Sequence, residues 1–415
     1  MSNSPNFIYF LIIGIVVSGF ILDRILEGLN ASWRQKPIPA ELQEIYDQEK
    51  YMKQQSYAKV TDRFSMLTSS ISFLLALLFL VFGGFNWLNQ LLLPNFSHPI
   101  LLGLTFLGTL FLIVELIEMP FDWYATFVIE EKFGFNKTTP TIYVTDKLKG
   151  YLIGTILGTI FYGLLFQLNV WFPKTFWLYV WAAIALFMVL LSMFYSNIIV
   201  PIFNKQKPLP DGELKEAILR FSDKVGFKVK DIYEIDGSKR STRANAYFTG
   251  LGRYKRIVLY DTLIQELTVD EIVAVLAHEM GHNKKKHILI SLITSLVQMG
   301  IMLFIMAIFI NNPLLSEALG SESHFFHLGL IAFALLYSPI STIIGLVMNL
   351  LSRSNEYQAD AYACQHANGE SLVSALKKLA SNNLSNLTPH PAYVFVNYSH
   401  PDLWHRVIRI KKHGA

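Results

Sequence analysis

The sequence predicts an all-α polytopic membrane protein with seven transmembrane helices and one small α+β insertion. Of its 415 residues, 52% are hydrophobic and only 16% are charged, and the mean hydropathy is +0.37. Soluble proteins carry about 25% charged residues, so this composition is typical of a membrane protein. Seven long, nearly uncharged runs and one basic segment of mixed character lead to the same fold class. The net charge of +4 does not suggest nucleic-acid binding.

Each of the seven apolar runs is long enough to cross about 30 Å of hydrocarbon. The first run has no Lys or Arg before it and no small-residue cleavage site after it, so we expect a retained helix rather than a signal peptide. The runs cover residues 6–22, 64–86, 99–117, 151–172, 176–202, 288–310 and 328–351.

Lysine and arginine are distributed unevenly between the loops. Loops 87–98 and 311–327 contain neither residue, whereas the first loop, loop 118–150, segment 203–287 and the tail after 351 are basic. The positive-inside rule then places the N-terminus outside or in a lumen and the C-terminus in the cytoplasm. It also places segment 203–287 and the tail on one side of the membrane.

Four regions follow from this pattern. Residues 1–202 hold five transmembrane helices with their loops, and 203–287 form a cytoplasmic insertion that carries His278-Glu279-Met280-Gly281-His282. Residues 288–351 hold helices six and seven, and 352–415 form a cytoplasmic helical tail.

The insertion mixes secondary-structure types. The sequence predicts a helix over 211–225 and two short strands, at 230–235 and 256–260, the second β-branched and followed by a turn. We expect the next helix to run on through Lys284, Lys285 and Lys286 into the sixth span.

That helix carries His278-Glu279-Met280-Gly281-His282. Histidines four residues apart lie on one helical face, so both imidazoles can reach one zinc ion, and Glu279 can touch a water bound to it. Thr268 and Glu271 form a capping-box pattern at the start of the helix. Because Cys364 is the single cysteine, the metal must be held by histidine and carboxylate.

Catalytic zinc usually keeps three protein ligands and one open position. His287 fails as the third ligand, because the elongated motif needs Gly at 285 and His at 288, where the chain has Lys285 and Ile288. Glu356 is the better candidate. Asp360 lies on the same helical face and can accept a hydrogen bond from a zinc-bound histidine. Taken alone, this pair is also compatible with a solvated acidic helix face.

The chain resembles the type I CAAX prenyl proteases, which are integral-membrane zinc metallopeptidases of the gluzincin kind. The resemblance covers nearly the whole length. It rests on residues 121–124, 129–136, 238–241, 245–248, 256–261, 278–282, 356–361 and 398–401.

The resemblance implies seven helices enclosing a water-filled chamber, with the zinc site at its cytoplasmic end. It implies one Zn²⁺ per chain, held by His278, His282 and Glu356, with Glu279 as the catalytic carboxylate. In such proteins the cleft that binds substrate is lined by Asn245, Ala246, Tyr247 and Phe248, and the residues facing the reacting peptide are His400 and Arg406.

The expected function is that of a zinc-dependent membrane endopeptidase, which removes the C-terminal tripeptide from prenylated CAAX proteins or peptides. We expect a monomer in the lipid bilayer, in the endoplasmic reticulum of a eukaryote or the inner membrane of a bacterium. A membrane quality-control metalloprotease would use the same residues and remains an alternative. A transporter or receptor is disfavoured, because the chain lacks the repeated halves common in transporters.

Overall fold

The computed structural model describes residues 4–229, 231–249 and 256–414. Within these ranges, seven helices are long and apolar enough to cross a membrane, which confirms the predicted fold class and number of spans. They are α1 (Pro5–Trp33), α2 (Gln48–Val81), α4 (Pro99–Tyr124) continued by η3 (Ala125–Glu130) and α5 (Glu131–Phe133), α6 (Pro140–Trp171), α7 (Phe176–Ile198) continued by α8 (Val200–Phe203), α12 (His287–Phe309) and α14 (Phe326–His366).

Several of these helices extend well beyond their apolar runs. Residues 118–133, predicted as a loop, are helical, and they include a π-helical turn at Ala125–Glu130. Helix α14 continues past residue 351, so Glu356 lies on the same continuous helix as the seventh span. The second span begins and ends earlier than predicted: α2 ends at Val81, because Gly83 adopts a left-handed φ of 67° before α3 (Gly84–Leu92).

The predicted continuous helix through Lys284–Lys286 is wrong. Helix α11 (Val269–Lys284) ends before this point, and Lys286 has a left-handed φ of 61°. Helix α12 then begins as a separate element at His287. The hydrophobic pattern alone gave no signal for this break, since lysine has no preference for that conformation.

A four-stranded sheet forms in the insertion, in the order β1-β2-β4-β3. Strands β2 (Asp231–Ile235) and β4 (Arg256–Tyr260) are parallel, and β1 (Gln206–Pro208) and β3 (Ala246–Thr249) pair antiparallel to them. The two predicted strands are confirmed, with Lys230 outside the described residues, and so is the predicted helix, α9 (Glu213–Lys224).

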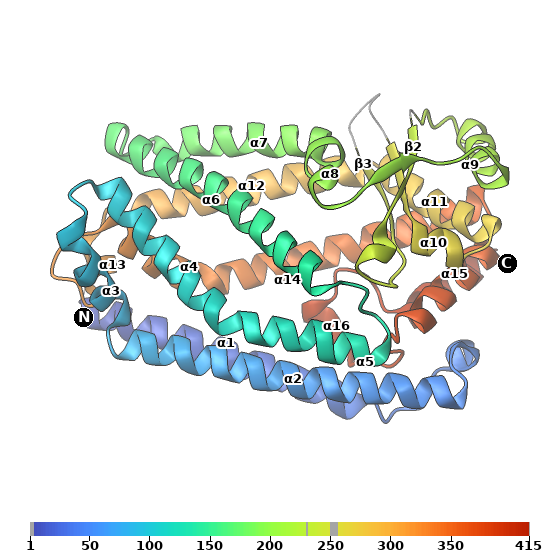
Figure 1. Cartoon of the computed structure of the whole chain (residues 1–415), viewed down its shortest axis with the longest axis horizontal. Coiled ribbons are helices and arrows are strands. Elements are labelled where there is room, and N and C mark those ends of the chain that lie inside the picture. The colour runs from blue at the N-terminus through green and yellow to red at the C-terminus, as the bar shows by residue number, and fades with distance from the viewer. Residues whose placement is uncertain (1–3, 230, 250–255, 415) are drawn as a thin grey trace.

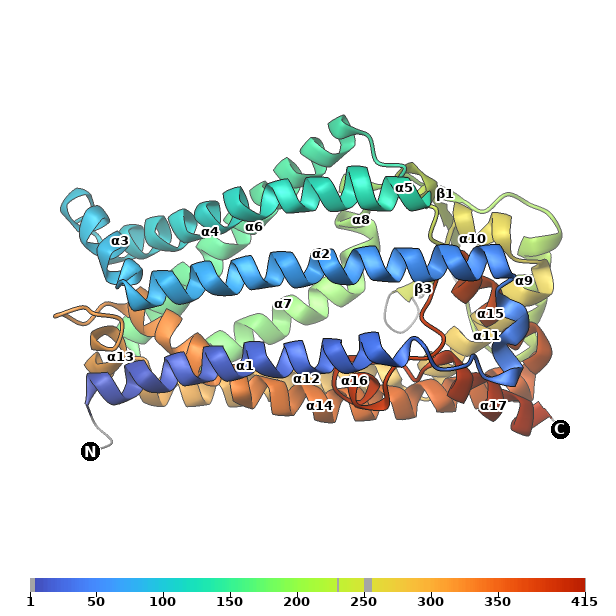
Figure 2. The ribbon, with the colours of Figure 1, turned by 90° about the horizontal axis from the view of Figure 1, so that it is seen from below.

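The sheet and the shorter helices gather at one end of the helical bundle, opposite the N-terminus (Figures 1 and 2). These helices are α9, α10 (Asp261–Glu266), α11, α15 (Gly369–Asn382) and α17 (Leu403–Gly414). At the other end lie α3 and α13 (Pro313–Glu317). The hydrophobic core divides in the same way, into one cluster among the spans and one among the sheet, α9, α11, α15 and α17, and a third, small cluster lies between the other face of the sheet and Val200.

The water-filled chamber, the orientation across the membrane and the four domain boundaries stay predictions.

Candidate active site

Helix α11 is fixed at its start by the predicted capping box, which the structure confirms. The backbone N–H of Thr268 donates to Glu271 Oε2 over 2.8 Å, and Glu271 N–H donates back to Thr268 Oγ1. Glu271 is buried and also accepts from Ser374 Oγ and Lys378 Nζ of α15. A carboxylate with this many partners both caps the helix and ties it to α15.

Helix α11 packs closely against α14 at the metal-binding motif. A Cβ added to Gly281 would lie 3.1 Å from Ala359 Cα and 3.1 Å from Tyr362 Cβ. A Cβ at this position would force the helices apart by a few tenths of an ångström, so glycine allows this close approach. The two helices that carry the candidate ligands are therefore held together next to the ligands themselves.

Three candidate metal ligands converge between these helices. His278 Nε2 lies 3.1 Å from His282 Nε2 and 3.4 Å from Glu356 Oε2, and His282 Nε2 lies 3.2 Å from Glu356 Oε1. Tetrahedral ligands about 2.0–2.1 Å from zinc stand roughly 3.3–3.4 Å apart. The separations and the donor set of two imidazoles and one carboxylate therefore fit a zinc ion with one open position.

Asp360 and Arg406 position His278 on the side of the imidazole that faces away from the other ligands. Its Nδ1 lies 2.8 Å from Asp360 Oδ1, and Arg406 binds both oxygens of Asp360 at 2.7 and 3.0 Å. Burial opposes charge on this imidazole, but hydrogen bonds with Asp360 and Glu356 raise the pKa of His278 to about 9. Without a metal, the His278 imidazole therefore favours its protonated form, and a metal that binds there must displace that proton.

Glu279 is half-buried on α11 between the two histidines. Burial raises the pKa of its carboxyl, while the neighbouring His278 and His282 oppose that shift. A carboxylate with a raised pKa is suited to taking and returning a proton near neutral pH.

The structure brings His400 to this cluster, while Arg406 lies largely covered behind it. His400 Nε2 is 3.4 Å from Glu356 Oε1, its side chain is 60% exposed, and its Nδ1 contacts Ser399 Oγ at 2.9 Å. The Arg406 side chain is only 12% exposed, and its remaining contacts reach Glu356 and His278. Arg406 can therefore act on the site through Asp360 and Glu356.

The predicted substrate-binding residues lie on β3, at an edge of the sheet, and just before it. Ala246 and Phe248 pack on the core that includes α11, and Tyr247 packs on the opposite face against Tyr260. Asn245 is exposed, and its carbonyl accepts from Tyr260 N–H. Since β3 pairs only with β4 among the described strands, its other backbone edge is open to an extended peptide.

Two stretches that carry the family resemblance lie against each other before β3. Asn136 forms a bridge with Ser241, Lys137 N–H donates to the carbonyl of Arg240, and Thr242 N–H donates to the carbonyl of Phe135. Arg240 also binds Asp146 of α6 through two nitrogens. The segment that leads into β3 is thereby fixed to the membrane helices.

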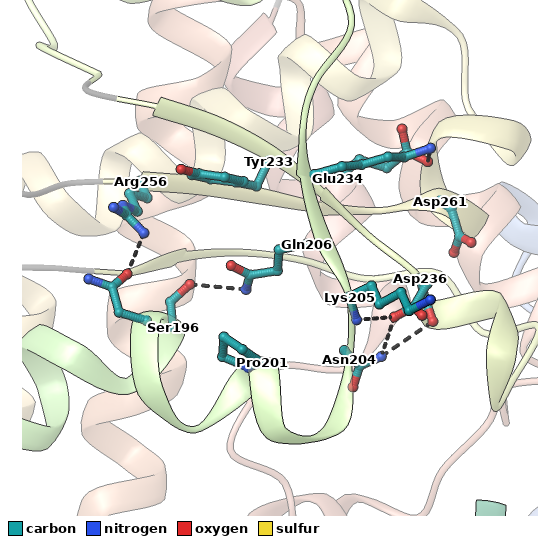
Figure 3. Close-up of a pocket in the computed structure, with 12 residues that line it drawn as sticks. Ser196, Pro201, Asn204, Lys205, Gln206, Tyr233, Glu234, Asp236, Arg256 and Asp261 are labelled. Atoms are coloured by element: carbon teal, nitrogen blue, oxygen red, sulfur yellow. Dashed lines mark hydrogen bonds and ion pairs between the residues drawn. The ribbon is translucent and has the colours of Figure 1, made fainter.

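A separate pocket of about 900 Å³ lies between the sheet and the junction of α7 and α8 (Figure 3). None of the predicted site residues lines it. Several of its polar groups are paired with one another: Asn204 donates to Asp236, Gln206 contacts Ser196, and Arg256 binds Asn197. These bonds brace the sheet on the membrane helices, and we assign the pocket no catalytic role.

One residue of the centre was missed from the sequence. His287, rejected as a ligand, is buried and places Nδ1 3.1 Å from Nδ1 of His282. Its spacing of five residues from His282 was the only available signal, and an unbroken helix would have separated the two rings.

Seven membrane-crossing helices, with a His-Glu-His centre at one end, define a multi-pass membrane metallopeptidase. Residues 29–205 match the family model described as CAAX prenyl protease N-terminal, five membrane helices, and residues 208–413 match peptidase family M48. The chain belongs to the CAAX prenyl protease 1 group of this family.

Relatives match over most of their length. The chain is 35% identical to the probable CAAX prenyl protease 1 of Schizosaccharomyces pombe, covering 95% of this chain and 87% of the relative. It is 33% identical to CAAX prenyl protease 1 of Saccharomyces cerevisiae, covering 95% and 94%. The crystal structure of S. mikatae Ste24p superposes with a TM-score of 0.92 at 32% identity, covering 97% of this chain and 99% of that one.

Proposed function

We propose that this protein is a zinc-dependent endopeptidase that removes the C-terminal tripeptide from prenylated CAAX proteins or peptides. The observation that carries the proposal is the convergence of His278, His282 and Glu356 within 3.1–3.4 Å, with Glu279 beside them. The names of the relatives favour a CAAX substrate over a general membrane protein.

His278, His282 and Glu356 would hold one zinc ion per chain. Bound there, zinc supplies Lewis acidity toward the scissile carbonyl and lowers the pKa of water to about 7. Glu279 removes the proton from the attacking water. The raised pKa of Glu279 strengthens it as a base in this step, and it then delivers the proton to the leaving amine.

Two further groups support this chemistry. Asp360 accepts a hydrogen bond from Nδ1–H of His278 and fixes its tautomer, and Arg406 holds the Asp360 carboxylate in place. His400, exposed beside Glu356, donates to the developing oxyanion of the substrate. Loss of one such donor commonly lowers the rate about 10²–10³-fold.

The substrate peptide pairs with the open edge of β3 through backbone hydrogen bonds, with Asn245 at its end. Because Ala246, Tyr247 and Phe248 direct their side chains into packing, recognition here depends mainly on the backbone and limits sequence preference. The prenyl group would lie against apolar membrane helices. We place the active site on the cytoplasmic side of the bilayer, in a protein that acts as a monomer.

The test uses the purified protein in detergent with two matched peptides, one ending in a farnesylated CAAX sequence and one unmodified. Mass spectrometry follows cleavage with and without a chelator. Chelator-sensitive loss of three residues from the farnesylated peptide alone is the expected result. Cleavage of both peptides would instead identify a broad membrane metalloprotease, and cleavage of neither by zinc-loaded protein would refute the substrate class.

A further inference from the structure

We infer that His287 is a positioning residue of the metal centre, which orients His282 by accepting a hydrogen bond from its Nδ1–H. The inference rests on the proposed zinc site. It gives each ligand histidine its own partner: Asp360 for His278 and His287 for His282.

The break in the backbone between α11 and α12 positions His287 beside His282. Residues five apart stand about 140° around an uninterrupted helix, so the rings of His282 and His287 would diverge if α11 ran on. Instead α11 ends at Lys284, and the left-handed φ of 61° at Lys286 turns the chain before α12. A non-glycine residue in this conformation is uncommon and concentrates where function requires it. Here its consequence is the contact of the two rings.

The geometry fixes the direction of the hydrogen bond. Nε2 of His282 faces His278 Nε2 and Glu356 Oε1, at 3.1 and 3.2 Å, and is the ligand atom. A neutral imidazole that binds a metal through Nε2 carries its proton on Nδ1. That Nδ1 lies 3.1 Å from Nδ1 of His287, which must therefore be the acceptor. His287 is then neutral, with its proton on Nε2.

The surroundings of His287 suit such an acceptor. The residue is only 4% exposed, and the polar side chain of Gln358 on α14 interacts with the ring, while the buried Nε2 makes no hydrogen bond within the described residues. A neutral acceptor fixes the tautomer of His282 without adding a further negative charge beside Glu356 and Asp360. The centre therefore keeps the Lewis acidity that a second carboxylate partner would reduce.

The test compares four variants with the wild type. His287→Leu removes the acceptor. His287→Asn restores one, because asparagine Oδ1, like histidine Nδ1, is bonded to Cγ. His287→Gln carries the same amide one bond further out, where it misses His282. Lys286→Gly is the control, because glycine adopts a φ of 61° without strain and leaves His287 in place.

The readout is the zinc dissociation constant of the metal-free protein, measured by competition with a chelator, alongside kcat and KM. We expect His287→Leu and His287→Gln to bind zinc about 10–100-fold more weakly, with kcat reduced and KM little changed. His287→Asn should recover most of the affinity, and Lys286→Gly all of it.

Equal zinc affinity in the Asn and Gln variants would overturn the inference, even if the Leu variant failed to fold. So would wild-type affinity in His287→Leu. In both cases the wild type still binds zinc and the proposed function stands. A wild type that binds no zinc would instead refute the proposed function itself.

Discussion

Gly281 of α11 lies directly against Ala359 of α14, where an added Cβ would come within 3.1 Å of the Ala359 Cα and 3.2 Å of its carbonyl oxygen. This glycine stands immediately before His282, and Ala359 lies three residues after Glu356. The contact therefore sets the distance between the helices that carry the three ligands. Neither atom of Ala359 belongs to a side chain that can rotate away.

Gly281→Ala should force α11 and α14 apart by a few tenths of an ångström. Overpacking of this kind costs about 1–3 kcal/mol, and here it also spreads the ligands. We expect a lower melting temperature in detergent and weaker zinc binding. Gly345→Ala is the matched control on α14, because its Cβ would meet no atom within 4 Å. Equal behaviour of the two variants would show that the helix contact does not set the site.

Removing a ligand should remove the metal. His278→Ala and Glu356→Ala each leave two of the three donors, so purified protein should contain much less than one zinc per chain. The control is His405→Ala: His405 is 56% exposed, and its ring binds Asp402 just before α17 and packs against Trp404. Full zinc content in either ligand variant would refute the assignment of that residue.

Zinc affinity should rise with pH up to about 9. In the metal-free protein burial disfavours the His278 cation, but Asp360 and Glu356 raise the pKa of His278 to about 9, above its usual 6.5. Below that pH, zinc must displace the proton, so affinity gains up to about tenfold per pH unit and then levels off. Titrations at pH 6.5, 7.5, 8.5 and 9.5 check this. A flat profile between 6.5 and 8.5 would contradict the proton held on His278.

Arg406→Gln should weaken both the fold and the metal centre. The substitution leaves the buried Asp360 carboxylate without its bidentate partner, and breaking a buried ion pair from one side costs about 3–5 kcal/mol. Arg406→Lys keeps the positive charge but cannot bind both oxygens of Asp360 at once. We therefore expect losses of stability and zinc affinity between those of the wild type and Arg406→Gln. Melting temperature and zinc affinity report the effect, with the exposed Lys412→Gln as control. If Arg406→Gln lowers only kcat, the guanidinium contacts the peptide instead.

The sequence predicted the features that depend on local pattern. Apolar runs defined seven spans, Thr268 and Glu271 defined the start of α11, and β-branched residues defined β4. These signals are short-range and are set by hydrophobicity, capping and strand propensity.

Features that depend on tertiary contact were not predicted. The break at Lys286 has no composition signal, because a lysine there adopts its conformation only in the folded context. The extension of α4 through residue 133 and of α14 through His366 follows from packing, since polar helix faces beyond an apolar run look like loops. The role of His287 depends on that unpredicted turn.

The most direct test of the central claim is Glu279→Gln, measured for zinc content and for cleavage of the farnesylated peptide in one preparation. Glutamine keeps the size of the side chain and does not alter the three ligands, but it cannot take a proton from water. We predict one zinc per chain and no detectable turnover, beside an active wild type. Turnover near the wild-type rate with zinc bound would contradict the role of Glu279 and with it the proposed mechanism.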